Sequence, residues 1–244
     1  MSGPHRPPPD PARTVVVVPT YNEREIFPAL ADAVLGLEGG WRLLVVDDNS
    51  PDGTGQMASA LARREPRASV LHRAQKEGLG PAYLAGFREA LKREEVDFIC
   101  QMDADFSHDP HDLPRLLAAL KEADLAIGSR YVKGGGTEGW SLKRRLLSRW
   151  GNQYVGLVLG VPARDMTAGF RCWRRGALES INFDAVQTKG YGFQIEMAYR
   201  AAAAGHQVVE VPIRFTERRA GKSKMSGSIV TEALVLPWKL RRIR

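Results

Sequence analysis

Two aspartates separated by one residue, Asp103 and Asp105, have the type and spacing that best suit chemistry in this sequence. They follow residues 96–102, whose mostly apolar sequence predicts a strand, and they precede a helix that Pro110 can begin. Carboxylates at positions i and i+2 after a strand can turn toward one point. Two carboxylates with few other ligands suit Mg²⁺ or Mn²⁺, which usually share their site with substrate phosphates. We therefore expect a divalent cation at this pair.

Two more polar clusters follow predicted strands. Residues 19–23 follow the four valines of residues 14–18, and residues 47–50 follow the apolar run at 42–46. Since ligands of parallel sheets bind beyond the carboxyl ends of the strands, the three clusters predict one site at one edge of a sheet. Each cluster alone would also suit a purely structural role, because Asx residues often cap helices.

Several common catalytic motifs are missing from the sequence. There is no GxxxxGK[ST] loop, no GxGxxG after the first strand, no GxSxG elbow and no HExxH helix. These absences argue against a P-loop kinase, a dinucleotide dehydrogenase, an α/β-hydrolase and a zinc protease.

The elements that must position the clusters alternate along the chain, which predicts an α/β fold with a mostly parallel sheet covered by helices on both faces. We expect one catalytic domain at residues 14–225, a flexible Pro-rich tail at 1–13 and a basic amphipathic C-terminal helix at 226–244. The expected strands are residues 14–18, 42–46, 68–71, 96–102, 125–127 and 207–211; the expected helices are residues 23–37, 53–64, 80–93, 110–120, 142–159, 193–204 and 228–242.

Composition and charge narrow the function class. The 244 residues are 43% hydrophobic and 26% charged, which is ordinary globular usage. Cys100 and Cys172 cannot build a disulfide scaffold and lack the paired spacing of a zinc site. Without a secretory signal, we expect the reducing cytoplasm. The net charge of +7 lies entirely in residues 211–244, which favours an anionic partner.

The C-terminal segment predicts contact with a membrane surface. No apolar stretch reaches the ~18 residues of a membrane span. Ile229, Ala233, Leu236 and Leu240 fall on one helical face that ends in basic residues, as in helices that lie on anionic lipid. We expect peripheral attachment to the cytoplasmic face of the membrane. Packing of this helix on the catalytic domain, or docking on a separate membrane-spanning protein, stays open. Nucleic acid is not expected, because the other 210 residues are neutral overall and lack alternating basic and aromatic residues.

Six motifs stand in an order typical of one family: PTYNE at 19–23, DDNSPDGT at 47–54, DAD at 103–105, GSRY at 128–131, TAGFR at 167–171 and GKSK at 221–224. With these motifs the chain resembles the polyprenol- or dolichol-phosphate mannosyltransferases of glycosyltransferase family 2 from about residue 14 to residue 225. The resemblance implies a GT-A fold, GDP-mannose as donor and a polyprenyl or dolichyl monophosphate as acceptor.

The same resemblance implies roles for individual residues. Asp105 and Arg130 would carry catalysis, and Asp103, Asp105 and Ser107 would hold the metal. Arg130, Arg144 and Ser148 would grip the acceptor phosphate; Arg144 and Ser148, four apart, share one face of the predicted helix. The donor would be held by Pro19, Tyr21, Glu23, Val46, Asp48, Asp103, Ala104, Asp105, Arg218 and Lys224.

Two positions depart from the family pattern. Ser107 stands where the family often has Gln, so its metal contact would run through water, and Ala168 stands where a Ser is common.

The acceptor phosphate, with a second pKa of about 6, is itself the nucleophile, so in-line attack would invert the anomeric carbon to give a β-linked product. The alternative is a family 2 transferase that moves a UDP-sugar, such as glucose, to undecaprenyl phosphate.

Overall fold

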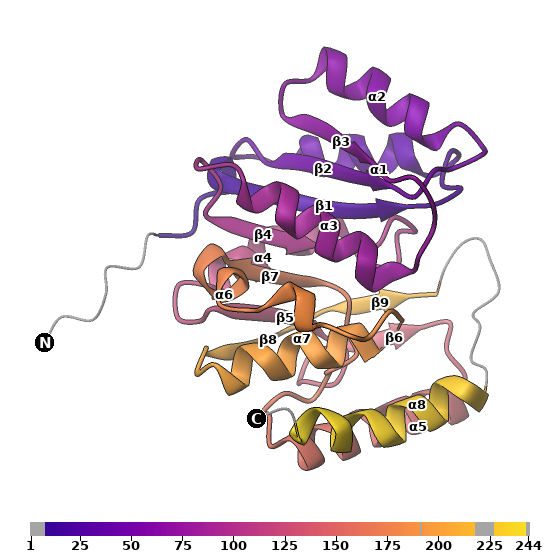
Figure 1. Cartoon of the computed structure of the whole chain (residues 1–244), viewed down its shortest axis with the longest axis vertical. Helices are drawn as coiled ribbons and strands as arrows, with labels where there is room; N and C mark the ends of the chain where they lie inside the picture. The colour runs from indigo at the N-terminus through magenta and orange to yellow at the C-terminus, as the bar shows by residue number, and fades with distance from the viewer. Residues whose placement is uncertain (1–7, 191, 218–226, 243–244) are drawn as a thin grey trace, which may run out of the picture.

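The computed structural model describes residues 8–190, 192–217 and 227–242, with only the backbone described for 227–233. Arg218 and Lys224, which the sequence predicts to contact the donor diphosphate, lie outside the described residues. A central sheet divides the molecule into two layers of helices (Figure 1).

The central sheet has seven strands in the order β3-β2-β1-β4-β7-β5-β8. Neighbouring strands are parallel except at β7, which runs antiparallel to both β4 and β5. The short strands β6 and β9 form a separate parallel pair. The strands are β1 (Thr14–Thr20), β2 (Arg42–Asp47), β3 (Ala68–His72), β4 (Phe98–Gln101), β5 (Leu125–Ser129), β6 (Gly136–Glu138), β7 (Arg171–Arg174), β8 (Val208–Pro212) and β9 (Arg214–Thr216).

The four valines of β1 explain why both faces of the sheet are covered. Because side chains alternate along a strand, Val15 and Val17 enter one hydrophobic core with α3, α6 and α7, while Val16 and Val18 enter the other with α1, α2 and α4. The mostly parallel, doubly covered sheet predicted from the sequence is confirmed. The helices are α1 (Phe27–Leu35), α2 (Thr54–Arg64), α3 (Leu79–Leu91), α4 (Leu113–Ala119), α5 (Leu142–Leu159), α6 (Arg175–Glu179), α7 (Gly192–Ala203) and α8 (Gly227–Arg241), with 3-10 turns at Pro11–Arg13, Pro110–Asp112 and Phe183–Ala185.

Strand β7 was not predicted: residues 165–171 were interpreted as a polar turn, and the strand begins where that turn ends. Arg171 and Arg174 are buried nevertheless. Arg174 donates from Nε to the carbonyl oxygens of Leu120 and Ala123 at 3.0 and 3.1 Å, and Arg171 donates to two carbonyls of the preceding turn. Burial of these charges is tolerated because the guanidinium groups bind backbone carbonyls.

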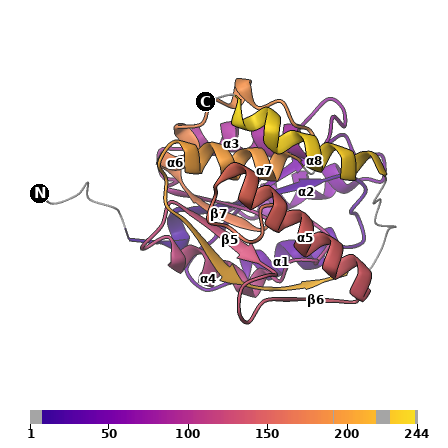
Figure 2. The same cartoon turned by 90° about the horizontal axis from the view of Figure 1, so that it is seen from below.

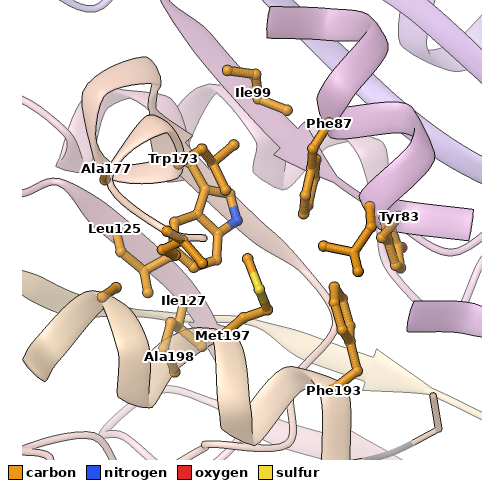
Figure 3. Close-up of a cluster of buried hydrophobic side chains, with 14 of the residues drawn as sticks. Tyr83, Phe87, Ile99, Leu125, Ile127, Trp173, Ala177, Phe193, Met197 and Ala198 are labelled. Atoms are coloured by element: carbon orange, nitrogen blue, oxygen red, sulfur yellow. The ribbon is translucent and has the colours of Figure 1, made fainter. Parts of the chain in front are cut away.

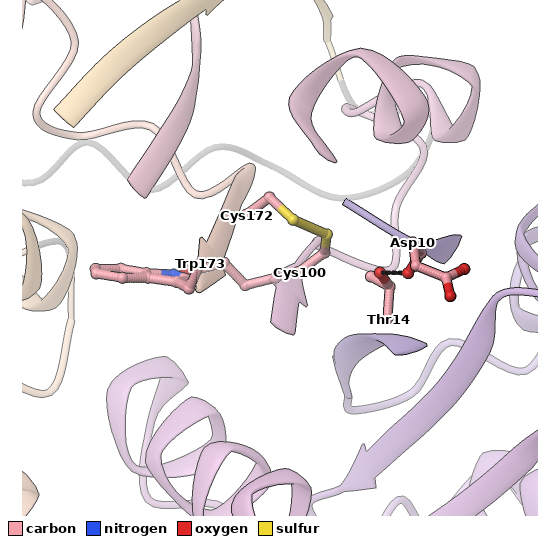
Figure 4. Close-up of a disulfide and its surroundings, with 6 residues drawn as sticks. Asp10, Thr14, Cys100, Cys172 and Trp173 are labelled. Atoms are coloured by element: carbon pink, nitrogen blue, oxygen red, sulfur yellow. Dashed lines mark hydrogen bonds between the residues drawn. A yellow bond between two sulfur atoms is a disulfide. The ribbon is translucent and has the colours of Figure 1, made fainter. Parts of the chain in front are cut away.

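Cys100 on β4 lies directly opposite Cys172 on β7, and the two form a disulfide (Figure 4). Their Cα atoms are 4.1 Å apart, near the spacing of a directly opposed antiparallel pair. One cross-link between neighbouring strands is not a disulfide scaffold, but the sequence analysis did not foresee the pairing. It could not do so, because it did not contain β7.

Helices α5 and α8 lie side by side, beyond the β8 edge of the sheet (Figures 1 and 2). Leu236 and Leu240 of α8 are buried in the core shared with α3, α5 and α7. The interpretation of these two leucines as membrane-facing is therefore wrong: the helix turns them toward the catalytic domain. The side chains of Ile229 and Ala233, the other residues of that predicted face, are outside the description. Among the described helices, none has the length and apolarity needed to cross a membrane.

Candidate active site

The aspartate pair lies in the loop that follows β4, and a buried tyrosine faces both carboxylates. Tyr83 of α3 donates its hydroxyl to Asp103 Oδ1 at 3.0 Å. Burial, and then the charges of Asp103 and Asp105, raise the pKa of Tyr83 well above its ordinary value. The hydroxyl therefore stays protonated and remains a donor. Asp105 accepts the backbone N–H of Ser107 at 3.0 Å, which fixes one of its oxygens.

The rest of this loop is held tightly around the aspartates. Phe106 has a φ of 55°, in the left-handed region that non-glycine residues seldom adopt and that clusters at functional sites. The Asp103 N–H donates to His108 Nδ1 at 3.3 Å, and the His108 ring stacks on Phe170 with centroids 4.9 Å apart. The loop thus presents its carboxylates from a fixed backbone.

The residues at this loop fit a divalent cation. Ser107 Oγ is buried and has no hydrogen-bond partner in the part of the chain that the structure describes, beside two carboxylates that precede it by two and four residues. Within the same described residues no group of three His, Cys, Asp or Glu side chains could hold a metal. A site with two carboxylates and a hydroxyl suits Mg²⁺ or Mn²⁺, because these ions take their remaining ligands from water and substrate phosphates.

The clusters after β1 and β2 are joined by the sheet register. Pro19 pairs with Val46, and Thr20 pairs with Asp47. Asp47 organises the turn that follows: its Oδ1 accepts the hydroxyls of Ser50 at 2.6 Å and Thr20 at 3.3 Å. The first aspartate of the DDNS motif is therefore explained by the local structure, and the second must be considered separately.

Asp48 is largely buried and pairs with Arg73, whose Nη1 lies 2.5 Å from Asp48 Oδ1. Burial raises the pKa of Asp48, and the Arg73 charge opposes that shift. Lys76 lies over the Tyr21 ring, 3.7 Å from its centroid. Arg73 and Lys76, which the sequence analysis did not single out, thus place two positive charges beside the predicted nucleotide residues.

The remaining predicted donor residues contribute in different ways. The Val46 side chain is fully buried and points at α3, where an added Cβ on Gly86 would lie 2.9 Å from it. Only the backbone of Val46 could therefore reach a ligand. The Glu23 carbonyl oxygen accepts the backbone N–H groups of Ile26 and Phe27 in the turn before α1. The Glu23 N–H donates to the Thr54 hydroxyl. That turn is why α1 begins at Phe27 and not at residue 23.

The predicted acceptor residue Arg130 is held by a buried carboxylate. It donates from Nε and Nη2 to the two oxygens of Asp165 at 2.7 and 2.6 Å, and from Nη2 to Thr167 at 2.8 Å. The Arg130 backbone N–H also donates to Asp165. The Arg130 Cζ atom lies 5.4 Å from the ring centroid of Trp140 and 5.5 Å from that of Phe215. The charge at Arg130 is therefore fixed in position before any ligand arrives.

Arg144 and Ser148 lie beside Arg130, at the start of α5. Arg144 stacks on Trp140 at 3.9 Å and pairs with Glu217 at 2.6 Å. The Tyr131 hydroxyl donates to Ser148 Oγ at 2.6 Å. Because Trp140 touches both arginines and Tyr131 follows Arg130 in the chain, the structure brings Arg130, Arg144 and Ser148 into one cluster. It can bind an anion such as a phosphate.

The strand order places the three groups in a row. The nucleotide clusters follow β1 and β2, the aspartate pair follows the neighbouring β4, and Arg130 follows β5 on the far side of β7. The aspartates therefore lie between two polar regions at one edge of the sheet. This arrangement can hold a cation with one anionic ligand on each side of it.

Sequence reasoning missed several residues that shape this site. His108 and Asp165 stand within or beside motifs that had been singled out, so their positions offered a signal. Tyr83 offered none, because it occurs in an apolar helical pattern that predicts core packing.

Comparison with known proteins identifies similar chains of nearly the same length. Residues 15–181 match the sequence profile of glycosyl transferase family 2. An undecaprenyl-phosphate mannosyltransferase of Micrococcus luteus is 49% identical over 227 residues, covering 91% of each chain. A polyprenol monophosphomannose synthase of Mycolicibacterium smegmatis is 51% identical over 233 residues, covering 94% of this chain and 88% of its own.

Solved structures share the fold at lower identity. A mannosyltransferase from Pyrobaculum calidifontis, solved in complex with GDP-mannose and Mn²⁺, is 17% identical with a TM-score of 0.65, over 97% of this chain and 66% of its own. Glucosyl-3-phosphoglycerate synthase from Mycobacterium tuberculosis, in complex with Mn²⁺, UDP-glucose and phosphoglyceric acid, is 18% identical with a TM-score of 0.67, over 97% and 85%.

Proposed function

Because the chain belongs to glycosyl transferase family 2, we propose that it is a polyprenyl-phosphate mannosyltransferase that takes mannose from GDP-mannose. The observation that carries the proposal is about 50% identity to two polyprenyl-phosphate mannosyltransferases over nine tenths of the chain. The GT-A fold and the arrangement of two polar regions about the aspartate pair support it.

The donor binds across the β1–β2 side of the site. Pro19, Tyr21, Glu23, Asp48 and the backbone of Val46 hold the guanosine. The diphosphate is contacted by Asp103, Ala104 and Asp105. It is also contacted by Arg218 and Lys224, which lie outside the described residues. When bound, Mg²⁺ or Mn²⁺ at Asp103, Asp105 and Ser107 neutralises charge on the diphosphate leaving group.

The choice of nucleotide separates this proposal from the alternative, a UDP-sugar donor. We expect calorimetry on the purified protein with Mn²⁺ to give tighter binding for GDP than for UDP. Tighter binding of UDP would favour the transfer of a UDP-sugar to undecaprenyl phosphate and would contradict the assignment of GDP-mannose.

The acceptor phosphate supplies its own nucleophile. A phosphate monoester is largely dianionic at neutral pH. Arg130, Arg144 and Ser148 hold it on the β5–α5 side, while the donor diphosphate lies on the other side of the anomeric carbon. In-line attack from this direction inverts that carbon and gives a β-linked mannosyl phosphate. The protein contributes orientation and fixed positive charge, and no side chain needs to act as a strong base.

Arg144→Ala should raise the KM for polyprenyl phosphate by about tenfold or more, because a hydrogen bond to a charged group is worth about 1.5–3 kcal/mol. GDP affinity measured by calorimetry should stay unchanged, since Arg144 lies on the acceptor side. The matched control is Arg145→Ala, and both variants are assayed with a short-chain acceptor. Arg145 is the next residue of α5 and is exposed. An equal loss of GDP affinity in Arg144→Ala would place this arginine on the donor side.

A continuous apolar and basic surface on α5 and α8 supports attachment to a membrane. Trp238 of α8 donates to the Tyr154 hydroxyl of α5 at 2.8 Å, and Trp150 stacks on Tyr154. Both tryptophans are more than half exposed. Tryptophan in this setting suits the boundary between lipid and water. The exposed residues of this surface also include Leu142, Lys143, Arg145, Leu146, Leu147, Arg149, Leu157, Leu234, Val235 and Lys239.

This surface, which we call the α5–α8 face, would lie on the cytoplasmic face of the membrane. Arg144 and Ser148 occupy the same helix but turn inward to Trp140 and Tyr131. A lipid phosphate could therefore reach them at headgroup depth while its chain stays in the bilayer. A separate membrane-spanning partner protein would use the same face.

Arg145→Glu combined with Arg149→Glu should lower binding to anionic phosphatidylglycerol vesicles by at least about thirtyfold, since each basic residue near the surface is worth about 1 kcal/mol. Co-sedimentation measures the binding. Arg63→Glu with Arg64→Glu, on exposed positions of α2, changes the net charge equally and should have little effect. Equal losses in both pairs would mean that net charge alone, and not the α5–α8 face, governs binding.

A further inference from the structure

A buried chain of hydrogen bonds runs from β7 through β4 to the start of α7. Trp173 Nε1 donates to Gln101 Oε1 at 2.8 Å, and Gln101 Nε2 donates to Gln194 Oε1 at 2.9 Å. All three side chains are buried. An indole N–H can only donate, so it fixes which way both amides face. The amide nitrogen of Gln194 is therefore the free end of the chain, and it is a donor.

This donor is buried and has no hydrogen-bond partner among the described residues. Gln194 is 3% exposed, and its Nε2 is unpaired. A methyl group added to Gly169 would lie 3.5 Å from Gln194 Nε2 and 3.5 Å from Asp103 Oδ2. The amide donor and the carboxylate oxygen thus border one small space that exists because residue 169 has no side chain. An unpaired buried donor costs about 1–3 kcal/mol, which a ligand in that space would relieve.

The first turn of α7 is held in place, so the amide is positioned before a ligand binds. The Phe193 ring stacks on Tyr83 with centroids 6.0 Å apart, and both lie with Trp173 in one cluster (Figure 3). The Glu196 carboxylate accepts the backbone N–H groups of Gln187 and Thr188 and pairs with Arg200. These contacts fix the segment before α7 as well as the helix.

The position of this space indicates which part of the substrates enters it. Gln101 lies on β4 and Gly169 precedes β7, between the nucleotide side at β1–β2 and Arg130 after β5. The group that passes between the two sides during the reaction is the sugar. A donor and an acceptor side by side also match a hydroxyl group, which accepts and donates at once.

We propose that Gln194 Nε2 donates a hydrogen bond to one hydroxyl of the transferred sugar, and that this hydroxyl donates to Asp103 Oδ2. The assignment rests on the proposed function for the identity of the donor. It makes Gln194 a residue that determines which sugar is accepted, and it makes Trp173 and Gln101 positioning residues that keep the amide turned toward the site.

The test combines a variant with altered substrates. Gln194→Met should lower kcat/KM for GDP-mannose by about tenfold, with GDP affinity unchanged. The four monodeoxy analogues of GDP-mannose are then compared. For the analogue that lacks the contacted hydroxyl, both proteins lose the hydrogen bond to Asp103, and the tenfold difference between wild type and the variant should disappear. The other three analogues should keep the tenfold difference between the two proteins.

Further variants separate this contact from a purely structural role. Gln194→Glu keeps an oxygen that accepts from Gln101 and, when ionised, replaces the amide donor with a second acceptor oxygen and a negative charge, so it should also abolish the difference between the analogues. Trp173→Phe frees the amides to turn and should do so in part. Gln56→Met, on an exposed position of α2, is the control and should behave as wild type. An equal loss for every analogue, or a matching loss of GDP affinity, would overturn the proposal.

Failure of the proposed function would be visible separately. Wild type that makes no mannolipid from GDP-mannose would overturn the mannosyltransferase assignment. The Gln194 contact is still tested in that case by calorimetry with the sugar nucleotide that wild type binds best. Gln194→Met should then weaken binding of the sugar nucleotide but not of the free diphosphate, and equal weakening of both would contradict it.

Discussion

Asp105→Asn should lower kcat/KM for mannosyl transfer by about a hundredfold or more while the protein stays folded. The proposed cation stabilises the diphosphate leaving group by several kcal/mol, and each 1.4 kcal/mol is a tenfold change in rate. Asparagine keeps an oxygen that can accept the Ser107 amide, which Asp105 binds at 3.0 Å, so the loop should keep its shape. The substitution removes the negative charge and one of the two oxygens that could bind the cation.

Activity and metal binding are measured together for this variant. Wild type should lose activity in EDTA and regain it with Mg²⁺ or Mn²⁺, and its Mn²⁺ affinity by electron paramagnetic resonance should fall in Asp105→Asn. Asp109→Asn is the matched control, because Asp109 is exposed and binds the backbone N–H and the ring of His111, away from the proposed cation ligands. Full wild-type activity in EDTA would contradict the role of the cation.

Asp165→Asn should lower the free energy of unfolding by about 3–5 kcal/mol, the usual cost of removing one partner of a buried ion pair. The Asp165 side chain is fully buried and that of Arg130 is 8% exposed. Loss of the carboxylate charge removes the counter-ion that Asp165 provides to the Arg130 guanidinium. It also removes the favourable charge that Asp165 provides to the buried Arg171.

Urea unfolding followed by circular dichroism measures this effect. Asp184→Asn serves as the control, because Asp184 pairs with Arg88 at a surface position where its side chain is 91% exposed, and it should unfold almost as wild type does. If Asp165→Asn were as stable as this control, the pair at Arg130 would not be the fixed charge on which the acceptor site depends.

The parts of the fold that the sequence predicted are those with a plain periodic signal. Four consecutive valines predict a strand buried on both faces, and β1 divides them between the two cores. The polar clusters were placed correctly at the carboxyl ends of the strands because that rule follows from parallel topology alone. The confirmed family and fold rest on these same clusters.

The parts that sequence reasoning missed depend on contacts between distant segments. Strand β7 carries two buried arginines. The carbonyl that Arg174 binds lies more than fifty residues away in the chain. Gln194 resembles a polar interruption of a core helix until Gln101 and Trp173 are seen beside it. Neither arrangement can be recognised from the spacing of residues along the sequence.

The C-terminal helix shows the limit of a periodic pattern. Its apolar residues occupy more than one face, and the sequence alone does not say which face meets α5 and α7. Leu236 and Leu240 pack inward, whereas Leu234, Val235 and Trp238 face outward and extend the exposed surface of α5. The proposed attachment to a membrane therefore involves the α5–α8 face, in which Leu236 and Leu240 have no part.

The most direct measurement of the central claim is the transfer reaction itself. Purified protein is incubated with labelled GDP-mannose, a short-chain polyprenyl phosphate and Mg²⁺ or Mn²⁺, and the label that enters the organic phase is counted. The product is then examined by nuclear magnetic resonance. The account predicts a polyprenyl phosphate that carries one mannose in the β configuration. Absence of organic-soluble mannose, or an α-linked product, would contradict it.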